Sequence, residues 1–136
     1  MVHLALCHTI IVDEKTGKYN ASSPDELALV NAAKFFGAVF KKRDEDNNMI
    51  IELNGEERRY KLLNILEFNS TRKRMSVIIE ESVPGPDGYN NIHILTKGAD
   101  SIILPRLNQE SCAFIKDTER FVDQYAREGL RTLLLA

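Results

Sequence analysis

The residues best suited to chemistry lie in one short stretch, residues 67–76, with the sequence EFNSTRKRMS. An aromatic side chain, Phe68, precedes three consecutive cations, Arg72, Lys73 and Arg74. A planar anionic ligand would find here a ring on which to stack and positive charges for its anionic groups. The ordinary alternative is a hairpin with a buried phenylalanine and a solvated basic turn. Taken alone, the stretch favours the ordinary alternative.

The flanking residues predict that this stretch joins two strands. Apolar residues alternate before it, at Leu62, Leu66 and Phe68, and alternate again after it from Met75. Residues 69–71, Asn-Ser-Thr, favour a turn between them. The sequence therefore presents the aromatic ring and the cations at one end of a β-hairpin.

A helix start is predicted upstream, at residues 22–26, SSPDE. Ser23 fits the N-cap, and Pro24 fits the first helical position. Glu26 fits the third, which would complete a capping box. The helix is expected to bury two adjacent rows of side chains that end in Phe35 and Phe36, and Gly37 is expected to end it.

The remaining elements are read from alternation and turn signals. Asn54-Gly55 is the strongest hairpin signal of the chain. Strands are predicted near residues 38–41, 49–53, 59–68, 73–80, 92–97 and 130–136, and helices near 99–104, disturbed by Pro105, and 111–128. Consecutive hairpin-linked strands imply an antiparallel sheet, and the helices must pack against it. The predicted fold class is α+β, an antiparallel β-sheet flanked by helices.

Length and composition set the outer bounds. The chain has 136 residues, which fits a single domain over 1–136. Its net charge of −2 argues against a general nucleic-acid binder, so no nucleic-acid partner is expected. No apolar run approaches the length of a membrane span, so any membrane role would be served from the water side. The apolar ending, LLLA, suggests a fragment of something larger.

Catalytic and metal-binding patterns are weak. The sequence contains no P-loop, no GxGxxG and no HExxH, so no catalytic residue is assigned. The two cysteines, Cys7 and Cys112, form no CxxC pair, which is typical of a reducing compartment with both thiols unpaired. His3, Cys7 and His8 could share one side of a helix, but no fourth ligand is evident, so no metal site is assigned.

Four short patches become informative together: SPDELAL at 23–29, EFNSTRKRMS at 67–76, TKGAD at 96–100 and GLRTLLLA at 129–136. Their order and spacing resemble the nucleotide-binding (N) domain of P-type ATPases. The wording SPDE, FNSTRKRMS and TKGAD is similar to the phospholipid-transporting (flippase) branch of that family. The resemblance covers nearly the whole chain and implies the same α+β fold.

The resemblance implies an ATP-binding site at matching positions. Phe68 matches the aromatic residue on which adenine stacks, and Met75 matches the apolar wall beside the base. Lys97, followed by Gly98 in the KGA motif, matches the lysine that lines the same pocket. Glu26 matches the acidic residue near the adenine amino group.

The phosphate side of the site is also implied by the resemblance. Lys73 matches the basic residue after the turn, and Arg131 matches the arginine that reaches toward the phosphates. The calcium-pump branch has an arginine two residues after the stacking phenylalanine, where this chain has Ser70. This chain therefore departs from the calcium-pump pattern at a position from which that branch would contact a phosphate.

The resemblance also shows which parts are missing. Residues 13–17, DEKTG, look superficially like the phosphorylated DKTGT motif, but Glu14 is inserted and no threonine follows Gly17. The phosphorylated aspartate and the Mg²⁺ ligands of the enzyme would lie in a phosphorylation domain outside this chain. An actuator domain and membrane helices would complete the ATP hydrolase and translocase. The chain is expected to be a monomeric fragment on the cytosolic face of a membrane, which binds ATP without turnover.

Two other functions are weighed against this one. The chain could be a protein-interaction domain that docks through its basic turn at 72–74. A stand-alone hydrolase is disfavoured, because no nucleophile or metal constellation is present.

Overall fold

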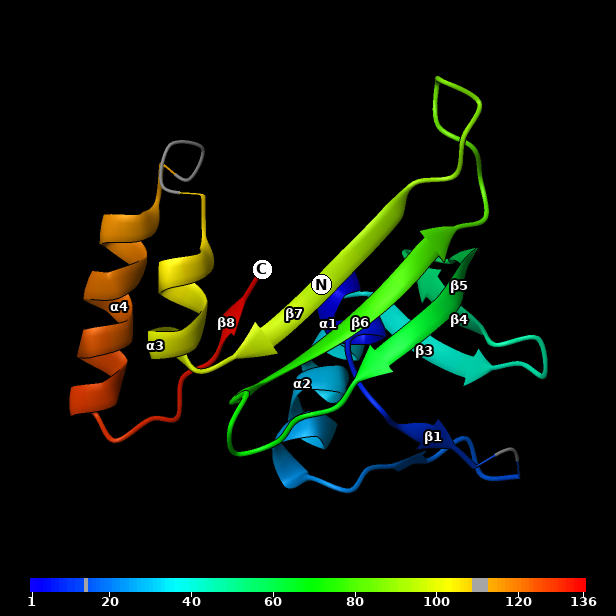
Figure 1. Cartoon of the computed structure of the whole chain (residues 1–136). Coiled ribbons are helices and arrows are strands. Elements are labelled where there is room, and N and C mark those ends of the chain that lie inside the picture. The colour runs from blue at the N-terminus through cyan, green and yellow to red at the C-terminus, as the bar shows by residue number, and fades with distance from the viewer. Residues whose placement is uncertain (14, 109–112) are drawn as a thin grey trace. The chain divides into compact units, whose positions relative to one another are not determined.

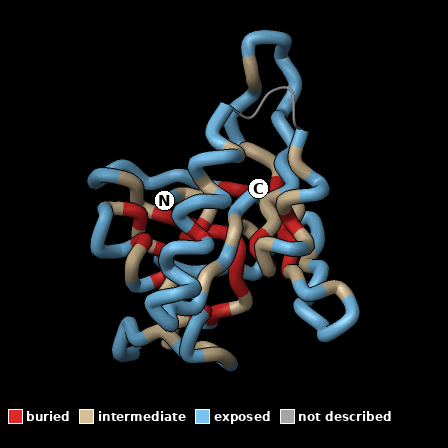
Figure 2. Tube along the Cα trace, turned by 90° about the vertical axis from the view of Figure 1, so that its left-hand side faces the viewer, coloured by how far each residue is buried: buried red, intermediate tan, exposed pale blue. Residues whose placement is uncertain are grey.

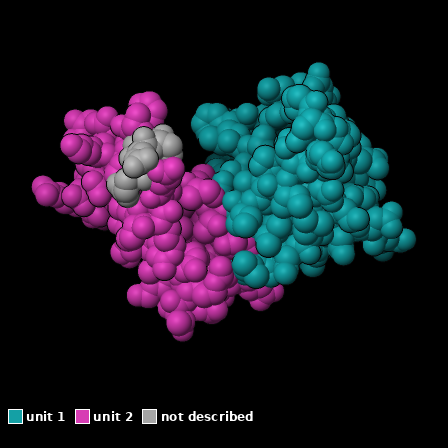
Figure 3. Space-filling model, turned by 45° about the horizontal axis from the view of Figure 1, so that its top comes forward, with its two compact units in different colours: residues 1–66, 77–95 teal, residues 67–76, 96–136 magenta. Residues whose placement is uncertain are grey.

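The structure is a computed structural model that describes residues 1–13, 15–108 and 113–136, and these form two compact units. The first unit contains residues 1–66 and 77–95, and the second contains residues 67–76 and 96–136 (Figure 3). That the whole chain acts as one domain stays a prediction.

An antiparallel sheet dominates the structure. Its strands follow one another in sequence order: β3 (Ala38–Arg43), β4 (Asn48–Leu53), β5 (Glu56–Leu66), β6 (Arg74–Glu81), β7 (Ile92–Gly98) and β8 (Leu134–Leu135). Two further short strands, β1 (Ile11–Val12) and β2 (Tyr19–Asn20), pair with each other. The helical elements are α1 (Val2–Leu6), α2 (Pro24–Phe35), α3 (Asp100–Ile103), the 3₁₀ turn η1 (Leu104–Arg106) and α4 (Ile115–Arg127) (Figure 1). The predicted α+β class is confirmed.

Short turns fix the register of the first strands. Asn54 and Gly55 both have positive φ, 52° and 90°, which is the conformation of a type I′ hairpin turn. This turn places Leu53 opposite Glu56 and sets the β4–β5 pairing. The hairpin that the Asn-Gly pair predicted is confirmed.

Asp44 organises the preceding turn, between β3 and β4. Its Oδ1 accepts hydrogen bonds from Asp46 N at 3.1 Å and from Asn48 N at 2.8 Å. The Asn48 side-chain amide donates to both carboxylate oxygens, at 3.1 and 3.0 Å. These bonds favour the ionised carboxylate, so those from the side chain and then the backbone of Asn48 lower the pKa of Asp44.

The start of α2 follows the prediction only in part. Ser23 is the N-cap and Pro24 begins the helix, but Ser23 makes no side-chain cap bond. The carboxylate of Glu26 instead accepts bonds from the backbone and the hydroxyl of Thr9, at 3.1 and 2.9 Å. The predicted capping bond of Ser23 is therefore wrong. Thr9, which is distant in sequence, binds the carboxylate of Glu26 instead. The local sequence around the helix start does not show this contact.

The buried face of α2 also differs from the prediction. Glu26, Val30 and Ala33 are its buried residues, a row spaced four and three residues apart. Phe35 and Phe36 are 83% and 61% exposed and contact each other edge to face, with ring centroids 5.1 Å apart. The helix ends here, because Gly37 turns the chain with φ of 85°. The last turn therefore lies beyond the packed row, and the two rings stay at the surface.

The first unit has its own core. Leu6, Val30, Ile51, Val77 and Ile79, from a helix pair and the sheet, are all at most 2% exposed (Figure 2). Burial of this kind contributes about 1.5–3 kcal/mol for each large aliphatic side chain.

His8 is buried beside this core with both ring nitrogens hydrogen-bonded. Nε2 donates to Ala5 O at 2.9 Å, and Nδ1 accepts from Ile10 N at 3.1 Å. Its ring contacts Phe40 edge to face at 4.4 Å. Across the described parts of the chain, no group of three His, Cys, Asp or Glu residues is placed to hold a metal ion. The contacts give His8 a structural role.

The C-terminal elements are shorter than predicted. Pro105 lies in η1, directly after α3, where its fixed φ suits a helix start and not a helix interior. The helix expected over 111–128 is described as α4 from Ile115, and the predicted start and Cys112 fall outside the described residues. The strand expected over 130–136 is reduced to β8, after Gly129 ends the helix region with φ of 78°.

Acid should loosen the β3–β4 turn through Asp44. The pKa of Asp44 is lowered in the folded state, so its stabilisation is present above the unfolded pKa and is lost as the pH falls through the folded value. Amide hydrogen exchange at Asn48 should accelerate over that range, and Asp44→Ala should show fast exchange at every pH. Glu45→Gln, an exposed carboxylate of the same turn, is the control and should exchange like the parent. Unchanged protection in Asp44→Ala would contradict this role.

Candidate functional site

The loop that carries Phe68 is built by Asn69. Its Oδ1 accepts hydrogen bonds from Thr71 N at 3.1 Å and Arg72 N at 2.7 Å, and its backbone oxygen accepts from Lys73 N at 2.8 Å. An asparagine that bonds its own downstream backbone closes a tight turn. The predicted turn between the two strands is confirmed.

Arg72 ties the two ends of this loop together. Its Nη1 donates to Glu67 O at 3.0 Å, directly before Phe68, and its Nη2 lies 3.5 Å from Ser76 Oγ on β6. The ring of Phe68 is 63% exposed. The alternative in which Phe68 is a core residue is therefore wrong, and the ring face is open to a ligand.

In the second unit, a pair of facing side chains shows the register between the start of β6 and the end of β7. Ser76 Oγ and Thr96 Oγ1 are 2.9 Å apart, so these two residues face each other. The same antiparallel register places Met75 opposite Lys97, and side chains of directly opposed residues lie on one face. Met75 is 5% exposed and Lys97 is 8% exposed. The apolar side chain of Met75 and the ammonium group of Lys97 thus lie side by side, on the face of the sheet opposite to Ser76.

Gly98 allows the chain segments to approach closely. A Cβ at this position would lie 2.6 Å from Arg74 Cβ and 2.8 Å from Lys73 O. Next to it, Ala99 N donates to Lys73 O at 3.1 Å. Lys73 itself has a positive φ of 49°, which is uncommon for a residue with a side chain. Only glycine fits between these backbones.

The other predicted site residues are placed as follows. The side chains of Lys73 and Arg131 are exposed, and Arg131 precedes β8, which pairs with Lys97 and Gly98. Six of the seven predicted residues thus belong to the second unit. Glu26 belongs to the first unit, where Thr9 already uses both of its carboxylate oxygens.

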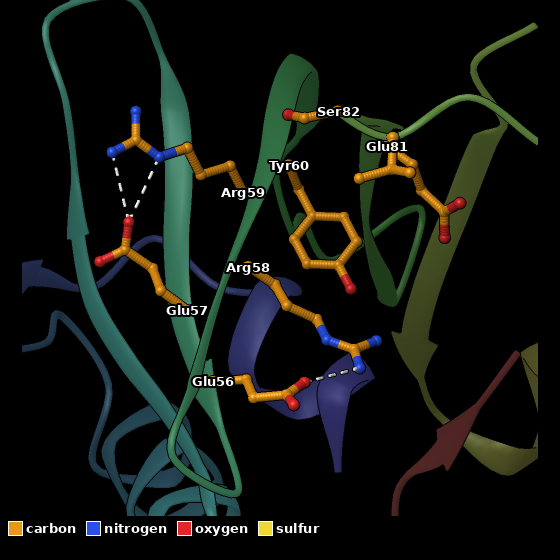
Figure 4. Close-up of a pocket in the computed structure, with 8 residues that line it drawn as sticks. Glu56, Glu57, Arg58, Arg59, Tyr60, Glu81 and Ser82 are labelled. Atoms are coloured by element: carbon orange, nitrogen blue, oxygen red, sulfur yellow. Dashed lines mark hydrogen bonds and ion pairs between the residues drawn. The ribbon is translucent and has the colours of Figure 1, made fainter.

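A separate pocket of about 530 Å³ lies in the first unit, between the start of β5 and the residues after β6. Figure 4 shows Arg58 turned toward Glu56 and Arg59 toward Glu57, at 3.6 and 3.2 Å. None of the predicted site residues lines it. Its charges are already paired, and three carboxylates surround the two arginines, so it does not suit a polyphosphate.

Sequence reasoning missed the supporting residues Arg72, Ser76 and Thr96. Arg72 appeared only as one of three cations, although its side chain bonds inward to the loop that bears Phe68. A signal existed for Ser76 and Thr96, because polar residues at inward positions of predicted strands need partners. That they pair with each other follows only from the register.

The whole chain matches a known protein family. A profile described as "P-type ATPase, cytoplasmic domain N" matches residues 1–136. The chain belongs to this family. The family predicted from the four sequence patches is therefore confirmed for this N domain.

The N domain is similar to parts of several curated proteins. It is 47% identical over 137 residues to phospholipid-transporting ATPase DRS2 of Saccharomyces cerevisiae and 48% identical over 139 residues to human phospholipid-transporting ATPase IK. It is 48% identical over 142 residues to phospholipid-transporting ATPase 10 of Arabidopsis thaliana. Each match covers 98% of this chain and 10–11% of the relative, so the N domain spans about a tenth of their length. The predicted branch is confirmed.

No helix among the described residues has the length and apolar character needed to cross a membrane.

Gly98→Ala should disturb the N domain through this close approach. The added methyl group would meet backbone atoms that cannot move aside, which costs about 1–3 kcal/mol. Thermal or urea unfolding should show a stability loss of this size, and the NMR signals of Lys97 and Met75 should shift. Gly85→Ala is the matched control, because there the new Cβ meets chiefly the mobile end of Asp87 at 3.1 Å. Equal effects of the two substitutions would show that Gly98 is not needed for space.

Proposed function

We propose that this N domain binds ATP for a phospholipid-translocating P-type ATPase and presents the γ-phosphate to a phosphorylation domain elsewhere in the same polypeptide. The exposed ring of Phe68, held by a loop that Arg72 closes, is the observation that carries the proposal. An exposed aromatic ring on an ordered loop suits stacking of a base, which contributes about 1–3 kcal/mol.

The proposed adenine site consists of predicted residues of the second unit. The adenine ring stacks on Phe68, with Met75 as an apolar wall and Lys97 beside it. Gly98 keeps the strand ends close enough for this arrangement.

The triphosphate is proposed to interact with the exposed cations Lys73 and Arg131. Both side chains are exposed, so water screens their charges. Ser70 offers a hydroxyl in place of a guanidinium. The phosphates are therefore held weakly and remain accessible to the phosphorylation domain.

Hydrolysis is proposed to need parts outside this chain. Asp13 is no phosphoryl acceptor, because its Oδ1 closes a turn by accepting bonds from Lys15 N, Thr16 N and Thr16 Oγ1. The bonds from Thr16, backbone first, lower the pKa of Asp13. The described residues offer no metal cluster, so the Mg²⁺ that would neutralise the phosphates is proposed to be held by the phosphorylation domain.

The proposal for the whole protein follows from the relatives. They are named phospholipid-transporting ATPases, and we propose the same activity for the parent of this N domain. Its actuator domain would complete the cycle, and its membrane segments would move the lipid. The N domain would then work on the cytosolic face of the membrane.

Phe68→Ala should weaken ATP binding while the fold is retained. Loss of one stacking contact corresponds to about a 5- to 150-fold rise in Kd. NMR titration with ATP measures the affinity, and circular dichroism measures the fold. Phe35→Ala removes a ring that is 83% exposed in the first unit and is the matched control, with unchanged affinity expected. Equal affinity of Phe68→Ala and the parent would overturn the proposed stacking and would favour the alternative, docking of a protein through residues 72–74.

The isolated N domain should bind ATP with a Kd of about 0.1–10 mM, because stacking and a few charged contacts only slightly exceed the entropy cost of association. Mg²⁺ should change this Kd little, since its proposed ligands lie elsewhere. Calorimetric titrations with and without Mg²⁺ test both points. Sub-micromolar affinity that depends on Mg²⁺, or steady ATP turnover, would contradict the proposal.

A further inference from the structure

Three arginines gather in the second unit, on the face of the strand ends opposite to Met75 and Lys97. Neighbouring residues of a strand point to opposite faces, so Arg74 shares its face with Ser76 and not with Met75. Its Nη1 donates to Arg72 O at 3.2 Å, and the Arg72 side chain reaches Ser76 Oγ. Two guanidinium groups thus lie together on this face.

Arg106 approaches the same place from η1. Arg74 Cα and Cβ lie against Gly98, and Ala99, the N-cap of α3, donates its N–H to Lys73 O. α3 begins beside that contact. The side chain of Arg106 reaches back to this helix, and its Nη1 donates to Ile102 O at 2.6 Å. α3 begins at Asp100, two residues after Gly98, so Ile102 lies in its first turn. The guanidinium of Arg106 is therefore held against α3, close enough to Arg74 for the two charges to repel each other.

The electrostatics agree with this geometry. Burial lowers the pKa of Arg74 below its ordinary value, and the charges of Arg106 and Arg72 lower it further. An arginine keeps its charge despite such a shift, so the repulsion persists in the folded protein. Among the described residues, neither Arg74 nor Arg106 forms an ion pair with a carboxylate; each donates to a backbone oxygen instead. The nearby Asp100 uses Oδ1 to accept from Ser101 N.

We propose that Arg72, Arg74 and Arg106 form a binding site for a phosphate group, separate from the proposed adenine site. Guanidinium groups present paired donors that match the oxygens of a phosphate, and a dianion relieves the repulsion among three like charges. Three pre-placed arginines favour phosphate over a single carboxylate, which carries one charge. The phosphate is free or carried by a phosphorylated side chain, since both present the same dianionic oxygens.

The site is tested on the whole N domain by NMR titration with inorganic phosphate, at constant ionic strength set with chloride. Signals of Arg74 and Arg106 should shift in a saturable way. Arg106→Gln should weaken phosphate binding at least about tenfold, as expected for the loss of one charge-assisted contact of about 1.5–3 kcal/mol. The control Arg127→Gln removes an exposed arginine from the last turn of α4 and should leave phosphate binding unchanged.

Two further experiments distinguish free phosphate from a phosphorylated side chain, and the arginine site from the proposed adenine site. A short peptide with one phosphoserine, compared with its unphosphorylated form, should shift the same signals; tighter binding than inorganic phosphate indicates a polypeptide source, and equal binding indicates free phosphate. ATP affinity should be the same in Arg106→Gln and the parent, whether or not the proposed adenine site exists. Absence of saturable shifts at Arg74 and Arg106, equal effects of the two substitutions, or weakened ATP binding in Arg106→Gln would overturn the separate site.

Discussion

The close approach of backbones at Gly98 is the constraint on which the second unit depends. Where Gly98 lies against Arg74 and Lys73, no side chain fits. This contact sets the register that places Met75 opposite Lys97, and it positions the start of α3. The proposed adenine site on one face and the arginine cluster on the other both depend on this one position without a side chain.

The sequence predicted those features that depend on local backbone chemistry. Asn54-Gly55 gave a hairpin, Pro24 began a helix and Gly37 ended it, since each residue type restricts its own φ and ψ. The open ring of Phe68 could not be derived from alternation, because a strand end can lie inside or outside the core. It was identified through the likeness of four short patches to a known family.

What sequence reasoning missed depends on contacts between distant residues. Glu26 was assigned to a capping box, but it accepts hydrogen bonds from Thr9, seventeen residues earlier. Phe35 and Phe36 were expected in the core because they continue apolar rows, yet α2 ends before those rows meet a partner. The inward bonds of Arg72 were hidden because three adjacent cations look alike in a sequence. Only the fold shows which of these cations also closes a loop.

The left-handed backbone of Lys73 has a consequence for how this protein can change. A residue with a side chain is strained at a φ of 49°, by about 1–3 kcal/mol, where glycine would be relaxed. Replacement by glycine would relax the turn and would delete the cation proposed to meet the phosphates. Selection for stability would therefore favour glycine at this position, whereas selection for nucleotide binding would favour lysine.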